Sequence, residues 1–555
     1  MTITVTVHTN EDDALIAWKP AGDWPSSWVG FKVEKKNVIT NEITMLNNRI
    51  PAAVGAAQTP AAGVPSDASP FRRCIWTDHA IASLDQLQYR VTPMIDGGAG
   101  VFTDAPEGAS DWTAPTTIGS ADANGLEAHF NRGTLMSQIV SRFVNDTVTA
   151  ASLKTFKTSL ADPTFAPRRY LSGHAREALL GFLADADRRG SHIYAAVYEF
   201  NDTEIIAALK AFGARASILL GNGDGMKPDL ATELSGAGLE VHERDLSKAG
   251  RSSPSVHNKF VLEVSSAGVA SRVLTGSLNW TVTGLCTQLN NTLIIERPAI
   301  ADRYLTQWHD LVAAGNDMPD TLKASNAKWL TDGPVSVAYA ATPSAEDFAP
   351  VLEAIAGAKD AILFLMFMPG ESPLLKNAMG RSAEANGPFV RGVVSTVITS
   401  KNGTITHVGG QVVVDGVTKP TDDDVIMPNG VPPQNRPTWA FDEFNRGSFT
   451  AAGLIAIVHS KTIVIDPFSD DCVVVTGSHN FSVSASQKND ENIVIIRGDK
   501  ALAQAYAVHI QGVYDAYAWR NFLQTNGDPN TLYQGLANWK PGGSHVRELD
   551  FWVQG

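Results

Sequence analysis

Two short segments of the 555-residue sequence each combine a histidine, a lysine two residues later and a downstream asparagine: His257, Lys259 and Asn279 in the first, and His459, Lys461 and Asn480 in the second. Side chains two residues apart on a strand point to the same face. Histidine can act as a nucleophile or a proton donor near neutral pH, and lysine and asparagine donate hydrogen bonds to anionic oxygens. Cleavage of a phosphodiester needs a nucleophile, an acid for the leaving oxygen and donors for the charged oxygens. The two segments therefore predict a site that cleaves phosphodiesters.

The two segments belong to an internal repeat. A Gly-Ser-x-Asn motif begins 18 or 19 residues after each histidine. The segments that align residue for residue are 275–281 with 476–482, and 291–295 with 492–496. In each copy an amphipathic helix precedes a buried strand, and this alternation predicts an α/β fold. We expect one α-β-α domain at 171–335 and a duplicate at 336–540, packed as a pseudo-dimer around one site.

This pattern resembles the phospholipase D superfamily, whose signature is His-x-Lys, four residues, Asp, and then Gly-Ser-x-Asn. The second copy matches the signature throughout, with Asp466 at the acidic position and Glu491 downstream. The first copy has Val264 at the acidic position, with Glu263 one place earlier, and Asn290 where the second copy has Glu491. The resemblance covers roughly two-thirds of the chain, given the predicted domain bounds.

The resemblance implies a role for each motif residue. His257 is the expected nucleophile, forming a phosphohistidine intermediate, and His459 is expected to protonate the leaving group and then to activate water. The side chains expected to hold the phosphate oxygens are Lys259, Lys461, Asn279 and Asn480. Glu491 is expected to orient a histidine through its second ring nitrogen. No metal or cofactor is expected, because the lysines supply the positive charge.

Other residues near the motifs have more modest expectations. The motif serines, Ser277 and Ser478, are expected to bind substrate, and Asp466 is expected to be structural. The acidic run 422–424 suggests calcium, but a solvated loop is the preferred interpretation. The segment Gly221–Gly225 is predicted to be a turn-rich loop rather than a phosphate cradle, since no Gly-Lys-Ser ending follows it.

The N-terminal region differs from the repeats. Short alternating runs separated by turn signals over residues 1–118 predict a small all-β sandwich that resembles a fibronectin type III or immunoglobulin-like module. Such a module is expected to act as a spacer or to bind a partner. Residues 119–170 are expected to form a linker and 541–555 a C-terminal tail.

Composition sets outer limits on the function. Acidic residues outnumber basic ones by 58 − 44 = 14, which argues mildly against a protein that grips a long polyanion. No run of residues is apolar enough over about 18 positions for a membrane span. The start of the sequence has no pattern of a secretory signal, so a cytoplasmic location is the default expectation. The three cysteines are too far apart in the sequence to suggest a metal pair.

Three functions remain open from the sequence. The first is a phospholipase D that hydrolyses or transphosphatidylates phospholipid headgroups at a membrane surface or micelle. The second is a nuclease or nucleotide phosphodiesterase, which requires a basic groove with stacking aromatics; the segment 436–446 is the suggestive stretch. The third is a binding protein whose repeat is no longer catalytic. A monomer suffices for catalysis, because one chain supplies both halves of the site.

Overall fold

The computed structural model describes residues 2–48, 63–119, 124–133, 139–140, 143, 149–249, 254–370, 372–384, 386–395, 405–408, 411–414, 417–420, 424–426, 454, 457–525 and 536–555. The suggestive stretch 436–446 and most of the acidic run 422–424 lie outside these residues. The interpretations placed on them therefore stay predictions.

The N-terminal region consists of two antiparallel sheets. One has the order β1 (Ile3–Thr9), β2 (Ala14–Pro20) and β7 (Ile75–Asp78). The other has the order β10 (Thr116–Thr117), β8 (Gln86–Asp96), β3 (Trp28–Asn37) and β4 (Ile43–Met45), with β9 (Phe102–Asp104) paired to β8. Trp18 of the first sheet meets Phe31 of the second edge to face, with 5.8 Å between ring centroids. The two sheets thus share one core, as in a β-sandwich.

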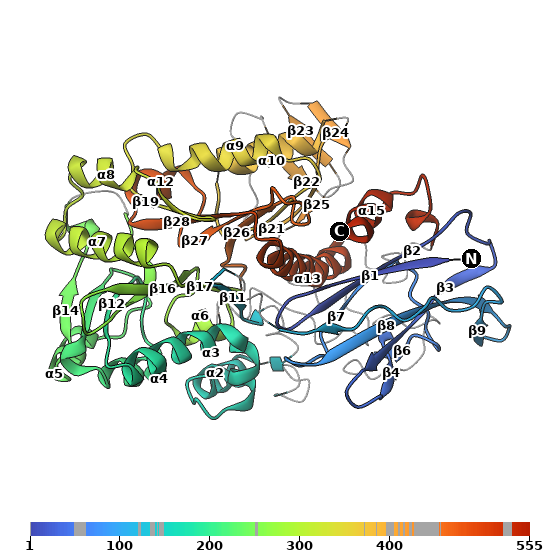
Figure 1. Cartoon of the computed structure of the whole chain (residues 1–555), viewed down its shortest axis with the longest axis horizontal. Helices are drawn as coiled ribbons and strands as arrows, with labels where there is room; N and C mark the ends of the chain where they lie inside the picture. Colours follow the sequence, from blue (N-terminus) through green and yellow to red (C-terminus); the bar gives the residue numbers. More distant parts are fainter. Residues whose placement is uncertain are drawn as a thin grey trace.

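The middle of the chain forms a seven-stranded sheet. Its strand order is β11 (Leu126–Phe130), β17 (Asn291–Ile295), β16 (Ala270–Gly276), β15 (Lys259–Val264), β12 (His192–Val197), β13 (Ala216–Leu220) and β14 (Glu240–Glu243). Its helices are α2 (Ala150–Ser159), α3 (Ala166–Arg188), α4 (Thr203–Lys210), α5 (Leu230–Gly236), α6 (Val282–Cys286) and α7 (Pro298–Ala314). Helix α7 packs on β12, β15 and β16 between this sheet and the next (Figure 1).

The C-terminal half forms an eight-stranded sheet. Its order is β18 (Leu330–Asp332), β19 (Val335–Ala340), β28 (Glu491–Arg497), β27 (Val473–Gly477), β26 (Lys461–Ile465), β20 (Ala361–Met366), β21 (Phe389–Val394) and β25 (Asp424–Ile426). Its helices are α8 (Asp320–Asn326), α9 (Ala349–Gly357), α10 (Pro373–Ser382), α12 (Val483–Lys488) and α13 (Lys500–Thr525). A separate three-stranded sheet has the order β22 (Ile405–Val408), β23 (Gln411–Val414) and β24 (Val417–Pro420).

The two large sheets have the same construction. Strands β11, β17, β16, β15, β12, β13 and β14 of one correspond in order to β19, β28, β27, β26, β20, β21 and β25 of the other. The pairing sense also agrees at every step, since the first five strands of each series are antiparallel and the last two pairs are parallel. Strands β12 and β20 are buried along most or all of their length, as apolar strands covered on both faces should be.

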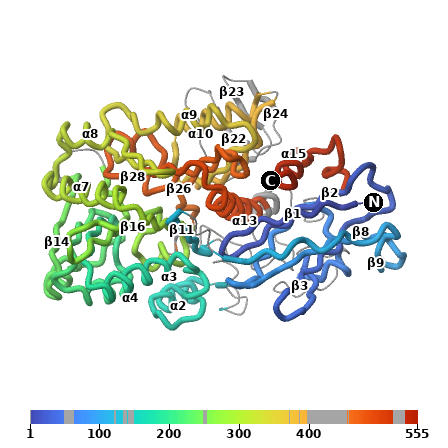
Figure 2. The backbone as a smooth tube through the Cα atoms, viewed as in Figure 1, coloured from blue at the N-terminus to red at the C-terminus, as the bar shows by residue number. Residues whose placement is uncertain are grey.

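Two predicted segments are more structured than the sequence suggested. The predicted linker 119–170 contains β11, which forms the edge of the seven-stranded sheet, and also helix α2. The predicted tail 541–555 contains helix α15 (Val546–Gln554), which packs on β1 and β2. Figure 2 shows this C-terminal helix beside the N-terminal strands, where His8 Nε2 lies 2.8 Å from the Trp552 carbonyl oxygen. Strand β11 and helices α2 and α15 are short, so tertiary contacts rather than local pattern hold them in place.

Helix α13 joins all three parts. It contacts β20, β21 and β26 of the second sheet, β11 of the first, and β1 and β2 of the sandwich. Its residues are buried on nearly every side over 502–517, which is typical of a helix enclosed in a core. None of the helices within the described ranges has the length and apolarity that a bilayer span demands.

Candidate functional site

The two His-x-Lys segments meet where the two large sheets face each other. His257 and His459 precede β15 and β26, and their ring centroids are 6.4 Å apart. The His257 amide donates to the Asp490 carbonyl at 2.9 Å, and the His459 amide donates to the Leu289 carbonyl at the same distance. Each histidine segment is therefore bonded to the backbone of the opposite half, and the two halves form one site.

Each histidine is also oriented by a side chain of the opposite half. His257 Nδ1 lies 2.7 Å from Glu491 Oε2, and His459 Nδ1 lies 2.9 Å from Asn290 Oδ1. Both acceptors bind the Nδ1–H, which leaves Nε2 of each ring for chemistry. The sequence predicted that Glu491 orients a histidine but gave Asn290 no role. Its alignment with Glu491 was the signal that pointed to it.

The motif serines support these orienting side chains. Ser277 Oγ donates to Asn290 Oδ1 at 2.9 Å, and Ser478 Oγ donates to Glu491 Oε2 at 2.8 Å. Both serines are completely buried. Each hydroxyl is thus engaged by an orienting side chain. The expectation that the two serines bind substrate stays a prediction.

The two lysines lie in equivalent places. Lys259 Nζ donates to the His257 carbonyl at 2.8 Å, and Lys461 Nζ donates to the His459 carbonyl at 2.6 Å. Each ammonium also lies over an aromatic ring, 5.0 Å from the Tyr198 centroid for Lys259 and 4.9 Å from the Phe367 centroid for Lys461. These contacts fix both cations beside the histidines.

Burial shifts the proton equilibria of the site. It lowers the pKa of Lys259 to about 7, although the charges of Glu491 and Glu199 oppose the shift. It lowers the pKa of His257 to about 4, and the pKa of Lys461 falls well below its usual value through burial and the charge of Lys259. The buried site thus disfavours its own positive charges, and a bound anion restores them.

The motif asparagines differ in their contacts. Asn279 Nδ2 donates to Glu199 Oε2 at 2.6 Å. Glu199 lies two residues after the end of β12, next to Tyr198. The sequence did not single out Glu199, because this residue belongs to neither motif. The side-chain oxygens of Asn279 and Asn480 are buried, and neither has a hydrogen-bond partner among the described residues.

Asp466 lies at the far end of β26 from Lys461. Its carboxylate accepts hydrogen bonds from the backbone amides of Lys359, Asp360 and Ala361, at the start of β20. In the first half Glu263 has a comparable position, and bonds to Arg189, Arg272 and Ser191 hold its pKa at about 2 against the opposing effect of burial. The missing acidic residue at Val264 is thus compensated one position earlier.

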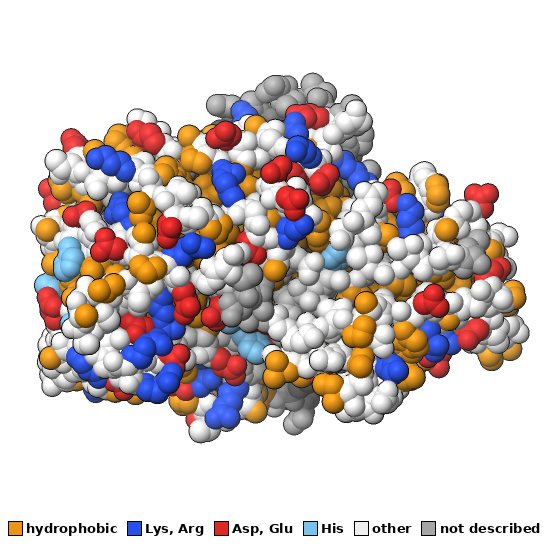
Figure 3. Space-filling view, viewed as in Figure 1, with side chains coloured by type: hydrophobic (Ala, Val, Ile, Leu, Met, Phe, Trp, Pro, Cys, Tyr) orange, Lys and Arg blue, Asp and Glu red, His pale blue; other side chains and the backbone are white. Residues whose placement is uncertain are grey.

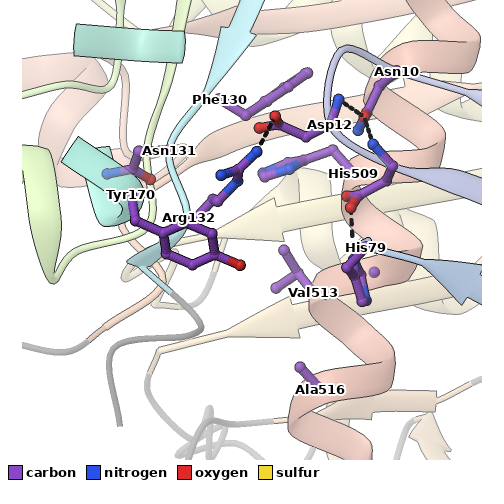
Figure 4. A pocket seen from close by; sticks show the side chains of 12 residues that line it. Asn10, Asp12, His79, Phe130, Asn131, Arg132, Tyr170, His509, Val513 and Ala516 are labelled. Atoms are coloured by element: carbon purple, nitrogen blue, oxygen red, sulfur yellow. Dashed lines mark hydrogen bonds and ion pairs between the residues drawn. The ribbon is translucent and has the colours of Figure 1, made fainter. Parts of the chain in front are cut away.

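A polar pocket lies outside this site, at the junction of the sandwich, β11 and α13 (Figure 4). Asp12 pairs with Arg132, and His79 Nδ1 lies 2.6 Å from Asp13 Oδ1. These pairs attach the turn between β1 and β2 to its surroundings. Among the residues that the structure describes, no group of three or more His, Cys, Asp or Glu side chains is arranged to hold a metal.

Comparisons with known proteins find similarity over part of the chain. Residues 351–513 match the family model described as cardiolipin synthase, PLD-like domain. Over 50 residues the chain is 46% identical to a phospholipase D of Rickettsia prowazekii (strain Madrid E), a stretch that covers 9% of this chain and 22% of that protein.

Three solved structures are similar at low identity. Phosphatidylserine synthase of Haemophilus influenzae Rd KW20 is 11% identical, with 68% of this chain and 94% of that one covered and a TM-score of 0.39. Polyphosphate kinase of Porphyromonas gingivalis is 13% identical, with coverages of 57% and 42% and a TM-score of 0.37. Nuc of Salmonella typhimurium, a phospholipase D family member, is 23% identical, with coverages of 33% and 94% and a TM-score of 0.19. The similarity that the family model finds, to a phospholipase D-like domain, lies at residues 351–513.

Proposed function

We propose that this chain is a phosphodiesterase that works through a phosphohistidine intermediate, without a metal, on phospholipid headgroups. The observation that carries the proposal is the pair of histidines with ring centroids 6.4 Å apart, each oriented through Nδ1 by the opposite half. Because each Nδ1 is engaged by an orienting residue, Nε2 is the ring nitrogen that each histidine can use in the reaction. Two buried lysines beside them supply the positive charge that a phosphate requires.

The reaction needs two steps at the same phosphorus. In the first, His257 Nε2 attacks, a P–N bond forms, the ester P–O bond breaks, and His459 gives a proton to the leaving alkoxide. In the second, His459 takes a proton from water, the hydroxide attacks phosphorus, and the P–N bond breaks to release His257. An alcohol in place of water gives transphosphatidylation. Lys259, Lys461, Asn279 and Asn480 hold the equatorial oxygens in both steps.

The orienting residues support this division of roles. Glu491 is a carboxylate, and its charge raises the pKa of His257 against the effect of burial. A carboxylate partner makes an imidazole a better base and nucleophile. His459 has the neutral amide of Asn290 instead, so its protonated form is less stabilised and gives up its proton more readily. This suits His459 to the role of acid toward the leaving oxygen.

The equal strand orders of the two sheets support a duplicated phospholipase D-like unit that forms an intramolecular pseudo-dimer. The two antiparallel sheets at the N-terminus support the fibronectin type III or immunoglobulin-like assignment in the same way. The choice of lipid substrate is supported by the names of the matched family and relative, and by the acidic net charge of −14. Acidic and basic side chains are mixed over the face seen in Figure 3.

The test is headgroup release from mixed phosphatidylcholine and phosphatidylethanolamine vesicles by the wild type and by His257→Asn and His459→Asn. Both variants are expected to lose activity, and the His459→Asn enzyme is expected to trap phosphorylated His257 when the leaving group is p-nitrophenol, which needs little acid assistance. If single-stranded DNA or RNA is cleaved and lipids are not, the proposed substrate is a nucleic acid instead of a phospholipid. If all three proteins behave identically on every diester, the proposed enzymatic activity is refuted.

A further inference from the structure

Glu199 is a carboxylate within the paired-histidine site that the proposed reaction does not use. Its Oε2 accepts a hydrogen bond from Asn279 Nδ2 at 2.6 Å. Its charge also favours the protonated forms of both Lys259 and Lys461, against the effect of burial. A negative charge therefore stands beside the donors that are expected to hold the phosphate.

The glycine-rich loop Gly221–Gly225 holds this side chain in place. The Gly225 amide donates to Glu199 Oε1 at 3.3 Å, and a Cβ on Gly225 would lie 2.9 Å from Glu199 Cδ. A Cβ on Gly223 would overlap Glu199 Cγ and the Tyr198 carbonyl. Glycine is thus needed at both positions, and the loop packs directly on the carboxylate. Sequence reasoning identified this loop only as a turn.

The opposite half has a methionine at the position equivalent to Glu199. In the strand pairings Val197 faces Lys259 as Met366 faces Lys461, so Met368 is the counterpart of Glu199. Met368 is 43% exposed and has no charge. At this pair of equivalent positions, the negative charge is therefore on the Asn279 side of the site.

This asymmetry has a consequence for the ligand. A carboxylate next to a phosphate repels it, unless the ligand carries a cation or hydrogen-bond donor that binds the carboxylate. We propose that Glu199 selects phosphate esters that carry an ammonium or similar donor group on the Asn279 side, and disfavours esters of plain alcohols and polyanions. The choice of substrates in turnover rests on the proposed function, but the selective binding of ligands does not.

Binding tests the proposal without any need for catalysis. Isothermal titration compares phosphocholine with glycerol 3-phosphate, monoesters that differ in their cationic group, on the full chain. The wild type is expected to prefer phosphocholine. Glu199→Gln is expected to reduce the affinity ratio about tenfold, because it removes the coulombic attraction between the carboxylate and the quaternary ammonium. The matched control Met368→Gln should leave the ratio unchanged. A ratio within twofold of the wild type in Glu199→Gln overturns the proposal.

Turnover separates this proposal from the proposed function. The substrates are p-nitrophenylphosphorylcholine and p-nitrophenyl thymidine 5′-phosphate, which share a leaving group. If both are cleaved and Glu199→Gln lowers the choline-to-thymidine ratio of kcat/KM about tenfold, both proposals are supported. If neither substrate is cleaved but Glu199→Gln lowers the ratio of phosphocholine to glycerol 3-phosphate affinity, the proposed enzymatic activity is refuted and the proposed selectivity of binding is supported. If Glu199→Gln lowers both rates equally, Glu199 only positions Asn279 and its selectivity is refuted.

Discussion

Replacing Asn290 by aspartate tests how the opposite half controls His459. Asn290 is completely buried, and its Oδ1 accepts hydrogen bonds from His459 Nδ1 and Ser277 Oγ, both at 2.9 Å. An aspartate can keep both of these bonds. Its second oxygen, however, replaces the amide nitrogen that now donates to the Gly284 carbonyl at 2.8 Å.

The change has two effects of different size. A carboxylate in contact with His459 should raise the pKa of that histidine by roughly 1–3 units, or about 1.4–4 kcal/mol of preference for the protonated form. The pKa now lies well below its usual value because of burial and the charge of Lys461. The lost bond to Gly284 should cost about 1–3 kcal/mol of folding stability.

The assay is the pH dependence of kcat/KM for choline release from a short-chain phosphatidylcholine, whose leaving group needs an acid. Because His459 must be protonated for the first step, a higher pKa should move the alkaline limb of Asn290→Asp upward by roughly 1–3 pH units. The reciprocal change Glu491→Gln should lower the rate and leave that limb in place. An unmoved alkaline limb in folded Asn290→Asp, or movement of that limb in Glu491→Gln instead, refutes the assigned roles.

Three further outcomes follow from the structure. Sulfate should raise the melting temperature more at pH 6 than at pH 8, because Lys259 with a pKa of about 7 is cationic below that value, and Lys259→Met should remove the difference measured by thermal melts. Glu11→Gln should cost about 3 kcal/mol by denaturant unfolding at pH 6.5, since Glu11 is buried and bonds His129. Because the pKa of His129 is raised to about 9, this cost should shrink as pH rises through 9. It should also shrink in acid, because burial raises the pKa of Glu11 and the carboxylate becomes protonated there. A cost unchanged at pH 10 would contradict this. Gly223→Ala should reduce the phosphocholine preference as Glu199→Gln does, whereas Gly236→Ala, where an added Cβ meets nothing within 4 Å, should not, and equal effects in both would assign the change to general destabilisation.

The sheets and the general place of the site could be predicted from local patterns. The run 361–366 is continuously apolar and forms the completely buried strand β20. The motif histidines stand just before strands, so the chain direction brings both copies to the facing edges. A strand of this kind can be recognised in the sequence because burial on both faces leaves no polar position in the pattern.

The contacts that orient the two histidines could not be predicted. Glu491 lies 234 residues from His257, and Asn290 lies 169 residues from His459. Local spacing carries no information about which half supplies each partner. The partners of the serines could not be predicted for the same reason, since a motif shows that Ser277 is near the site but not that its hydroxyl bonds Asn290. Glu199 belongs to no motif, and only the packing of a distant loop reveals it.

The N-terminal sandwich is linked to the site by packing and hydrogen bonds within the core. The Phe130 amide of β11 donates to Glu11 Oε1, and the Phe130 ring packs edge to face on Tyr506 of α13, with centroids 5.1 Å apart. Tyr506 Oη in turn accepts a hydrogen bond at 3.0 Å from Asn291, the neighbour of Asn290. The sandwich therefore supports the strand that carries one orienting residue. A separate spacer would make no such contact, and removal of residues 1–118 should weaken the support of His459 by exposing the core face of α13.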